Sequence, residues 1–188
     1  MNNQPIVIDN GSFETKMGYG GNIEPDLVIP TSLAYLDENK KDSNIFKLNK
    51  NDKYNNYYLG DKAISKIKES NNYLLGNPMK NGVIDNWDLM EIYWNQTIYN
   101  YLKCDPIEHC FFLIESIENS PDIREKMTEI FFETFNAFGL YIGSQPIVSL
   151  FGASHEIDDH IYNISKEQEE SMKSLTGIVV KSGESNKT

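Results

Sequence analysis

The stretch "VIDNGSFETKMGYGG", Val7 to Gly21, decides how the chain begins to fold. Residues 5–8 are apolar and mostly β-branched, which predicts a buried strand that ends at a turn over Asp9–Ser12. The alternating residues of "FETKMGYGG" predict a second strand paired with the first as a hairpin. The segment "DLVIP", closed by Pro30, predicts a third strand. The opening of the chain is therefore expected to be an antiparallel meander.

The turn between the first two strands has two interpretations, which the residues alone leave open. A strand that ends in Asp-Asn-Gly-Ser exposes several backbone N–H groups, and such a nest attracts phosphate oxygens. Gly11 would permit close approach, Ser12 would donate its hydroxyl and Lys16 would supply a counter-charge, while Asp9 would face a hydrated divalent cation. The alternative is a plain hairpin turn, for which Asn-Gly is the strongest short signal.

A second turn of the same kind stands near the other end, in "GIVVKSGES", Gly177 to Ser185. It also follows a β-branched run, "TGIVVK", which is expected to be a strand. Lys181 occupies the place that Asp9 has in the first copy. A phosphate site built from two similar hairpins would need both turns, so the similarity favours the phosphate interpretation of each.

Between the two turns the pattern predicts alternating helices and strands. Residues 37–56 are expected to be a long exposed loop, and "YYLGDKAISKIKES" a strand end followed by a helix from about Asp61. A helix is expected over Asp85–Leu102, with Asn86 as its N-cap. Its buried stripe would be Met90, Tyr93, Trp94, Thr97, Ile98 and Tyr101.

The next elements are the strand "HCFFLIES", with Glu115 at its end, and a helix that begins after Ser120. The buried stripe of that helix would be Met127, Ile130, Phe131 and Phe135. The strand "GLYIGS" and a helix from "QPIVSLFGAS" follow. Hairpins followed by alternating strands and helices predict an α/β fold, a mixed sheet covered by helices.

Two further features have a functional and a plain interpretation. Gln145, between a strand and a helix, either starts that helix or orients a water against a phosphate. The segment "SHEIDDH", Ser154 to His160, could supply metal ligands, but its two His are five residues apart, which on a helix turns them away from each other. An exposed acidic loop over residues 154–173 is the expected structure.

Composition excludes several classes of function. The 188 residues carry 17 Lys and Arg against 28 Asp and Glu, a net charge of −11, which argues against a nucleic-acid partner. No apolar run approaches the roughly 20 residues that a membrane span needs, and no signal peptide is evident. Two cysteines do not make a disulfide framework, so a cytoplasmic protein with free thiols is expected.

The chain resembles the actin superfamily over nearly its whole length. The stretches that carry the resemblance are "VIDNGSFETKMGYGG", "YLGDKA", "NGVIDNWDLMEIYW", "REKMTEIFFETFN" and "TGIVVKSGES", in the family's order and near its spacing. Within the superfamily the chain is most similar to the actin-related protein 3 subfamily, on "GNIEPDLVIP", "YNYLKCDPIEH" and "FNAFGLYI".

The resemblance implies a ribonuclease H-like fold, of which this chain would form the first half. It would have a mixed five-stranded sheet flanked by helices and a small inserted subdomain. Residues 1–32 and 71–188 would form the large subdomain, residues 33–70 the small one with its exposed loop, and residues 154–173 an acidic insert.

The resemblance also implies ATP and Mg²⁺ as cofactors. Asp9 matches the aspartate near the hydrated cation, and Gln145 the glutamine that positions the attacking water. The positions that match phosphate-binding residues are Gly11, Ser12, Phe13, Lys16, Ser182, Gly183, Glu184 and Ser185. Phe13 stands where the family has glycine, and Lys181 where it has its second cation-side aspartate.

The implied function is that of a cytoplasmic, cytoskeletal actin-related protein. It would resemble the ATP-binding subunit of the complex that nucleates actin branches, with actin and the other subunits as partners. Hydrolysis is expected to be impaired, because Lys181 would disfavour the metal. The alternatives are a truncated interaction fragment without nucleotide and an unrelated acidic metal-binding domain.

Overall fold

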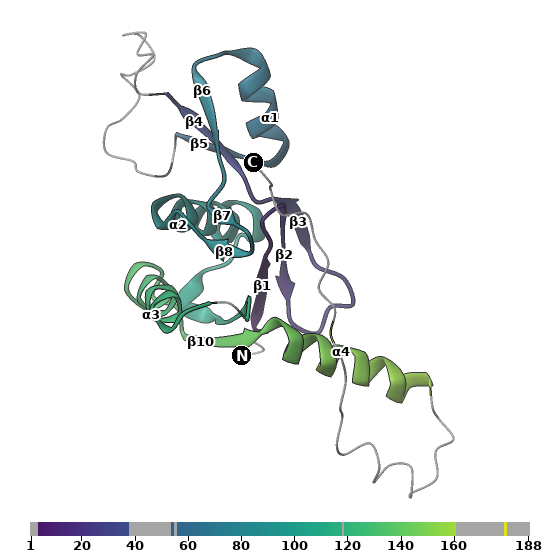
Figure 1. The fold of residues 1–188 in the computed structure, drawn as a ribbon. Helices are drawn as coiled ribbons and strands as arrows, with labels where there is room; N and C mark the ends of the chain where they lie inside the picture. The colour runs from purple at the N-terminus through teal and green to yellow at the C-terminus, as the bar shows by residue number, and fades with distance from the viewer. Residues whose placement is uncertain (1–3, 38–53, 55, 118, 161–178, 180–188) are drawn as a thin grey trace, which may run out of the picture.

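The computed structural model describes residues 4–37, 54, 56–117, 119–160 and 179. Its central element is a five-stranded sheet with the order β10-β9-β1-β2-β3 (Figure 1). The strands are β1 (Ile6–Asn10), β2 (Glu14–Tyr19), β3 (Leu27–Pro30), β9 (Cys110–Glu115) and β10 (Gly139–Ser144). The pairs β1–β2 and β2–β3 are antiparallel, whereas β9 pairs in parallel with both β1 and β10. The expected meander and the mixed sheet are confirmed.

A smaller sheet lies beyond the end of the large one. Its order is β5-β4-β6, built from β4 (Leu33–Leu36), β5 (Tyr57–Leu59) and β6 (Tyr73–Gly76), and the helix α1 (Gly60–Glu69) packs against it (Figure 1). The pairing of β6 with β4 carries this unit to Gly76, past residue 70. The division into two subdomains with a boundary at that residue stays a prediction.

The segment after β6 forms a short hairpin that sequence patterns did not predict, from β7 (Met79–Lys80) and β8 (Val83–Ile84). Asn81 and Gly82 between them both have positive φ, 53° and 80°. That backbone matches the two-residue turn that Asn-Gly favours. Strands of two residues show no alternation, so only this turn signal was available in the sequence.

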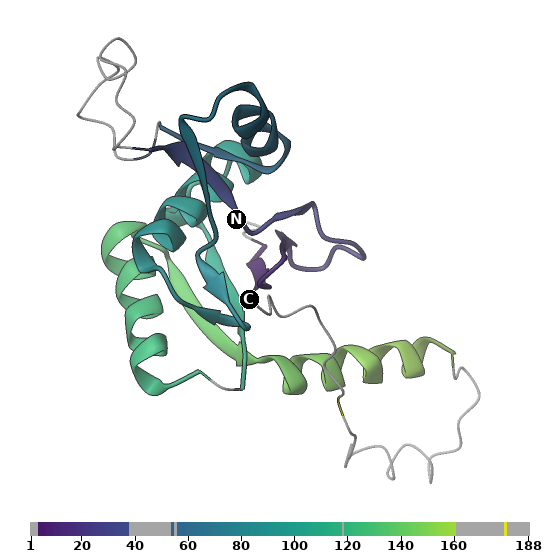
Figure 2. The ribbon, with the colours of Figure 1, turned by 45° about the horizontal axis from the view of Figure 1, so that its top comes forward.

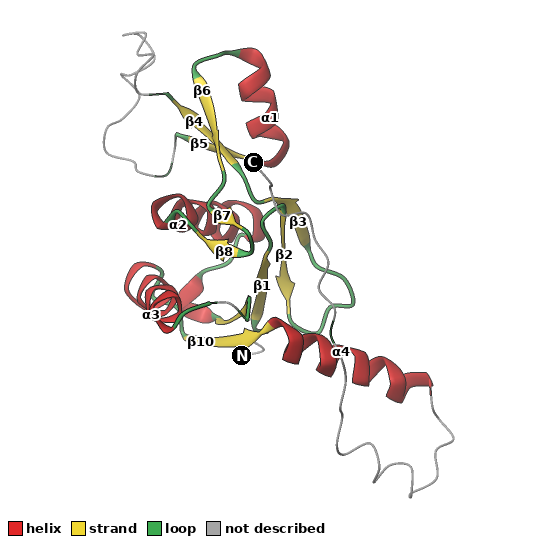
Figure 3. Cartoon of the chain, viewed as in Figure 1, coloured by secondary structure: helices red, strands yellow, loops and turns green. Residues whose placement is uncertain are grey.

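Two helices cover one face of the large sheet (Figures 1 and 3). The first is α2 (Trp87–Asn95), continued by a π-helical segment (Gln96–Leu102). The second is α3 (Pro121–Glu129), continued by a shorter π-helical segment (Ile130–Thr134). The short 3₁₀ turn Pro106–Glu108 precedes β9. The last helix, α4 (Gln145–His160), starts at the end of β10 and runs away from the sheet (Figure 2).

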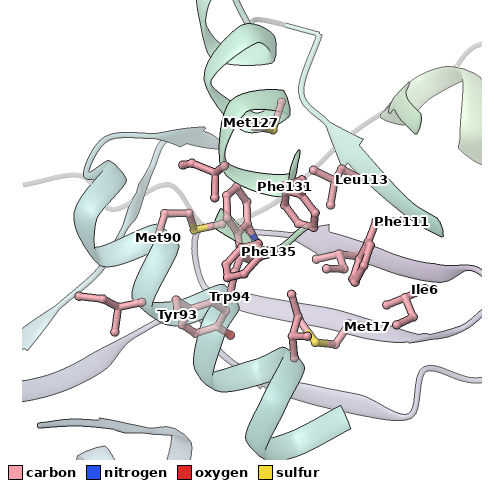
Figure 4. Packing of buried hydrophobic residues seen from close by; sticks show 14 of the residues in the cluster. Ile6, Met17, Met90, Tyr93, Trp94, Phe111, Leu113, Met127, Phe131 and Phe135 are labelled. Atoms are coloured by element: carbon pink, nitrogen blue, oxygen red, sulfur yellow. The ribbon is translucent and has the colours of Figure 1, made fainter. Parts of the chain in front are cut away.

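The core lies between these helices and the sheet (Figure 4). Trp94 and Phe131 pack edge to face with ring centroids 5.0 Å apart, and Phe131 contacts Phe111 of β9 at 5.1 Å. All members of the two expected helical stripes are buried except one. That exception is Tyr101, which is 36% exposed. The π-helical winding explains the error, because its i→i+5 hydrogen bonds rotate Tyr101 off a stripe counted at 3.6 residues per turn.

The expected acidic loop over residues 154–173 is wrong at its start, since α4 continues to His160. The helix pattern of "QPIVSLFGAS" therefore extends into the acidic stretch, where no Gly or Pro follows Gly152 to end it. Residues 161–173, most of the expected loop at 37–56, and the expected strand "TGIVVK" apart from Val179 lie outside the described residues.

Candidate functional site

Three strand ends meet at one edge of the large sheet. Because β1, β9 and β10 are parallel, their carboxyl ends share that edge, which is the usual place for a ligand in an open α/β sheet. Asp9 lies at the end of β1, and Gln145 begins α4 directly after β10. Only β9 stands between these two strands, so their backbones are about 10 Å apart. The fold therefore brings Asp9 and Gln145 to the same edge.

The turn over Asp9–Phe13, here called the first turn, is a tight hairpin. The Gly11 N–H donates to the Glu14 carbonyl at 3.0 Å. A Cβ added at Gly11 would lie 2.7 Å from that same oxygen, so a larger residue would displace the turn. The Phe13 side chain is 68% exposed, and its carbonyl accepts from the Thr31 N–H at 2.9 Å. Phe13 therefore belongs to the turn through its backbone, while its ring faces solvent.

Ser12 is held by the segment that follows β6. Its hydroxyl oxygen accepts a hydrogen bond from the Gly82 N–H at 2.7 Å, and its carbonyl accepts from the Asn77 side-chain amide at 2.7 Å. The Asn77 amide oxygen in turn accepts from the Met79 N–H at 2.8 Å. The Gly82 bond uses an acceptor position of the Ser12 hydroxyl and leaves the hydroxyl proton to donate elsewhere. Sequence reasoning gave Asn77 and Gly82 no role, because both contacts join residues more than 60 positions apart.

Asp9 and Lys16 share the face of the sheet that is turned away from the core. They are direct partners in the β1–β2 register, and directly opposed residues project to the same side. We call this side the open face and define it by Val7, Asp9, Lys16, Phe112 and Tyr141. The Lys16 ammonium lies 3.3 Å from a carboxylate oxygen of Glu14, and both side chains are about half exposed. Lys16 therefore brings a solvated positive charge to the Asp9 side of the sheet.

Glu115, at the end of β9, is a buried carboxylate on the core side of the same edge. The Arg124 guanidinium forms an ion pair with it, with Nε 2.7 Å from Oε1, and the Asn119 amide donates to Oε2 at 3.3 Å. The hydrogen bond to Glu115 raises the pKa of Arg124 above its ordinary value. This pair fixes the start of α3 against the strand end, and sequence reasoning had noted Glu115 only as the end of a strand.

The rest of the expected site falls on residues that the structure does not describe. These are Lys181, Ser182, Gly183, Glu184 and Ser185. Within the described ranges, no group of three or more His, Cys, Asp or Glu side chains is placed to hold a metal ion. Among the same residues, none of the helices has the length and apolar character that crossing a bilayer requires.

The family model for actin matches residues 1–188. The chain belongs to the actin family. Actin-related protein 3 of Caenorhabditis elegans is 38% identical over 95% of this chain, and that of Dictyostelium discoideum 40% identical over 95%. Actin-related protein 3 of Oryza sativa subsp. indica is 42% identical over 77% of the chain.

This actin-family chain spans about two fifths of the length of those relatives, with matched shares of 36%, 40% and 39%. The resemblance to the family and the α/β fold class, with a mixed five-stranded sheet flanked by helices, are confirmed. The site roles stay predictions, and we take them up below.

Proposed function

We propose that the first turn and the start of α4 form one side of an actin-type site for ATP and Mg²⁺. The observation that supports this most is the shared strand edge, with Asp9, the Gly11–Ser12 turn and Gln145 at the carboxyl ends of parallel strands. The phosphate-binding residues on this side would be Gly11, Ser12, Phe13 and Lys16. On the opposite side of the ligand, the phosphate-binding residues would be Ser182, Gly183 and Glu184.

The chemistry of the first turn fits such a ligand. Asp9 offers carboxylate oxygens to the water shell of a hard cation, and the Ser12 hydroxyl keeps a proton for a phosphate oxygen. Lys16 adds a positive charge on the same face of the sheet as Asp9. Phe13 takes part through its backbone, since its ring lies in solvent. When bound, Mg²⁺ supplies charge neutralisation on the phosphates.

Gln145 would orient water rather than react itself. It stands at the first position of α4, where backbone N–H groups and the helix dipole favour an anionic ligand. The side-chain amide of a glutamine can both donate to and accept from a water molecule, which is how such a residue sets the direction of an attacking water. We expect hydrolysis to be slow, because Lys181 replaces a carboxylate on the metal side with a positive charge.

At the level of the cell, the proposed role is that of a cytoskeletal, cytoplasmic actin-related protein. The partners would be actin and the subunits of the complex that nucleates actin branches. The support for this part is the similarity to actin-related protein 3 in several organisms. A chain that binds these partners without nucleotide is the second candidate, and the observation that favours it is Lys181.

A calorimetric double-mutant cycle tests the proposed site. The unmodified chain is expected to bind Mg-ATP in the millimolar range, about −4 kcal/mol. The Lys181→Asp variant should bind more tightly in the presence of Mg²⁺. The Asp9→Ala variant is the third chain of the cycle and the double variant the fourth. In the double variant Asp9→Ala should abolish that gain, because both carboxylates would act on one hydrated ion.

Three results of the cycle would count against the proposal. Micromolar binding by the unmodified chain would show that Lys181 does not impair the site. Additive effects of the two substitutions would mean that Asp9 and residue 181 do not act on the same ion. Absence of Mg-ATP binding in all four chains would favour the nucleotide-free candidate.

A further inference from the structure

The residue between Asp9 and Gly11 has its own set of buried partners. The Asn10 amide oxygen accepts from the Trp94 indole N–H at 3.3 Å and from the Thr15 hydroxyl at 3.4 Å. The indole N–H can only donate, so the Asn10 atom that faces it is the amide oxygen, and the Thr15 hydroxyl donates to that same oxygen. The orientation of the Asn10 side chain is therefore fixed by α2 on one side and β2 on the other.

The hydrogen bonds continue beyond Thr15 in one direction. The Thr15 and Thr31 hydroxyl oxygens are 2.8 Å apart, and both residues are fully buried. Thr15 has a single hydroxyl proton and gives it to Asn10, so Thr31 must donate to Thr15. The order of donation is thus from Thr31 to Thr15 to Asn10, a chain in which each hydroxyl proton is used once.

Thr31 stands where the backbone passes from the large sheet to the small one, between Pro30 and Leu33. Its own N–H donates to the Phe13 carbonyl at 2.9 Å. The neighbouring Pro30 carbonyl accepts from the Tyr93 hydroxyl at 3.2 Å, which anchors this connection to α2. The connection between the sheets is therefore bonded to both ends of the first turn, through Phe13 and, by way of Thr15, through Asn10.

Because side chains alternate along a strand, the contacts of Asn10 lie on the opposite face of the sheet from the expected ligand. Asn10 and Thr15 are direct partners in the register and project toward the core, whereas Asp9 and Lys16 project to the open face. The Asn10 side chain thus touches the protein interior, while its two backbone neighbours carry the groups proposed to meet Mg-ATP. A shift of Asn10 must move Asp9 and Gly11 with it.

We propose that Asn10, Thr15 and Thr31, with Trp94 as the second donor, are positioning residues for the first turn. They hold Asp9, Gly11 and Ser12 in place from the core side and do not touch the ligand. This inference deepens the proposed Mg-ATP site and rests on it for its ligand. The placement of the turn by the three residues can be measured without any ligand.

The test compares two substitutions of the same chemical kind in the same core. Thr15→Val removes a buried hydroxyl from the positioning residues. Thr97→Val removes one that donates to the Tyr93 and Trp94 carbonyls, within its own helix, and is equally buried. Because both replace a buried threonine by valine, losses of overall stability should be similar. Only Thr15→Val should disturb the first turn.

Two quantities are measured. The first is the rate of amide hydrogen exchange at Gly11 and Gly82, which NMR records, and the second is the affinity for Mg-ATP. Thr15→Val should speed exchange at Gly11 about fivefold to tenfold over Thr97→Val and weaken Mg-ATP binding by a similar factor. Thr15→Ser, which keeps the hydroxyl, should restore both values. Thr31→Val serves as a second test if Thr15→Val does not fold.

Equal exchange at Gly11 in the Thr15→Val and Thr97→Val variants would overturn the positioning role. Failure of Thr15→Ser to restore slow exchange would overturn it as well. If the unmodified chain does not bind Mg-ATP, the proposed site fails. In that case the exchange at Gly11 still decides whether the three residues position the turn.

Discussion

At the scale of single residues, neighbouring side chains at the end of β1 project to opposite faces of the sheet. Asp9 faces the open side of the sheet with Lys16, and Asn10 faces the core with Thr15. The order Asp-Asn-Gly-Ser therefore places a carboxylate on the open face, an amide toward the interior, a glycine that the turn requires and a hydroxyl. Turn chemistry in the sequence indicated the first, third and fourth of these, and their roles toward a ligand stay predictions. The role of Asn10 depends on Trp94, a contact across 84 positions that no local pattern indicates.

The two cysteines are expected to differ in reactivity. Cys110 is exposed at the start of β9, whereas Cys104 is buried and its burial raises the pKa of the thiol to about 11. Since the thiolate is the reactive form, a disulfide reagent at pH 8 should modify one thiol of the native protein quickly. Cys110→Ser should remove the fast phase, and Cys104→Ser should retain it. A fast phase that survives in Cys110→Ser would contradict the burial of Cys104.

At the scale of elements, the helices show what a periodic pattern does and does not contain. The two buried stripes were predictable because the large apolar side chains of α2 and α3 recur at helical spacing. The π-helical ends of these helices were not predictable from the sequence. The segment Gln96–Leu102, for example, has no Gly or Pro that marks a change of winding. The β7–β8 hairpin and the Glu115–Arg124 pair were also missed, because they depend on short strands and on a contact between a strand and a later helix.

The two N-caps provide a matched pair for measurement. The Asn86 side chain accepts from the Leu89 N–H at 3.0 Å, whereas the Ser120 side chain makes no cap hydrogen bond. Asn86→Ala should therefore lower the free energy of unfolding by about 1 kcal/mol, and Ser120→Ala by clearly less. Urea denaturation of both variants is the measurement. A larger loss in Ser120→Ala would mean that the cap bond of α2 does not contribute as described.

At the scale of the whole molecule, the helices of the described ranges cover the two faces of the large sheet unequally. The helices α2 and α3 enclose the core on one face, as Figure 4 shows for its largest side chains. On the open face, α4 contacts the sheet near its start, where Val148 lies against Gly143. Tyr141 on that face is 67% exposed and Ile147 of α4 is 58% exposed. The mixed sheet was predictable from the order of hairpins and helices, but the extent of this exposure was not, because it depends on where α4 leaves the sheet.

Exposed apolar side chains of this size favour association of the chain with itself. Sedimentation over a dilution series should show oligomers that dissociate as the concentration falls. Ile147→Ser should weaken the association. Ile23→Ser is the control, because Ile23 is equally apolar and fully exposed in the loop between β2 and β3. A monomer at every concentration, or equal effects of both substitutions, would contradict association through the open face and α4.

The most direct test of the proposed site is an NMR titration of the isotope-labelled chain with ATP, with Mg²⁺ and then with EDTA. We expect the backbone amide shifts to change at Gly11, Ser12, Phe13 and Gln145, and the changes to be larger with Mg²⁺. The loop between β2 and β3 lies at the opposite end of the sheet from the first turn, beside the start of β1, and should keep its amide shifts. Changes confined to that loop, or none at the first turn at millimolar Mg-ATP, would contradict the site.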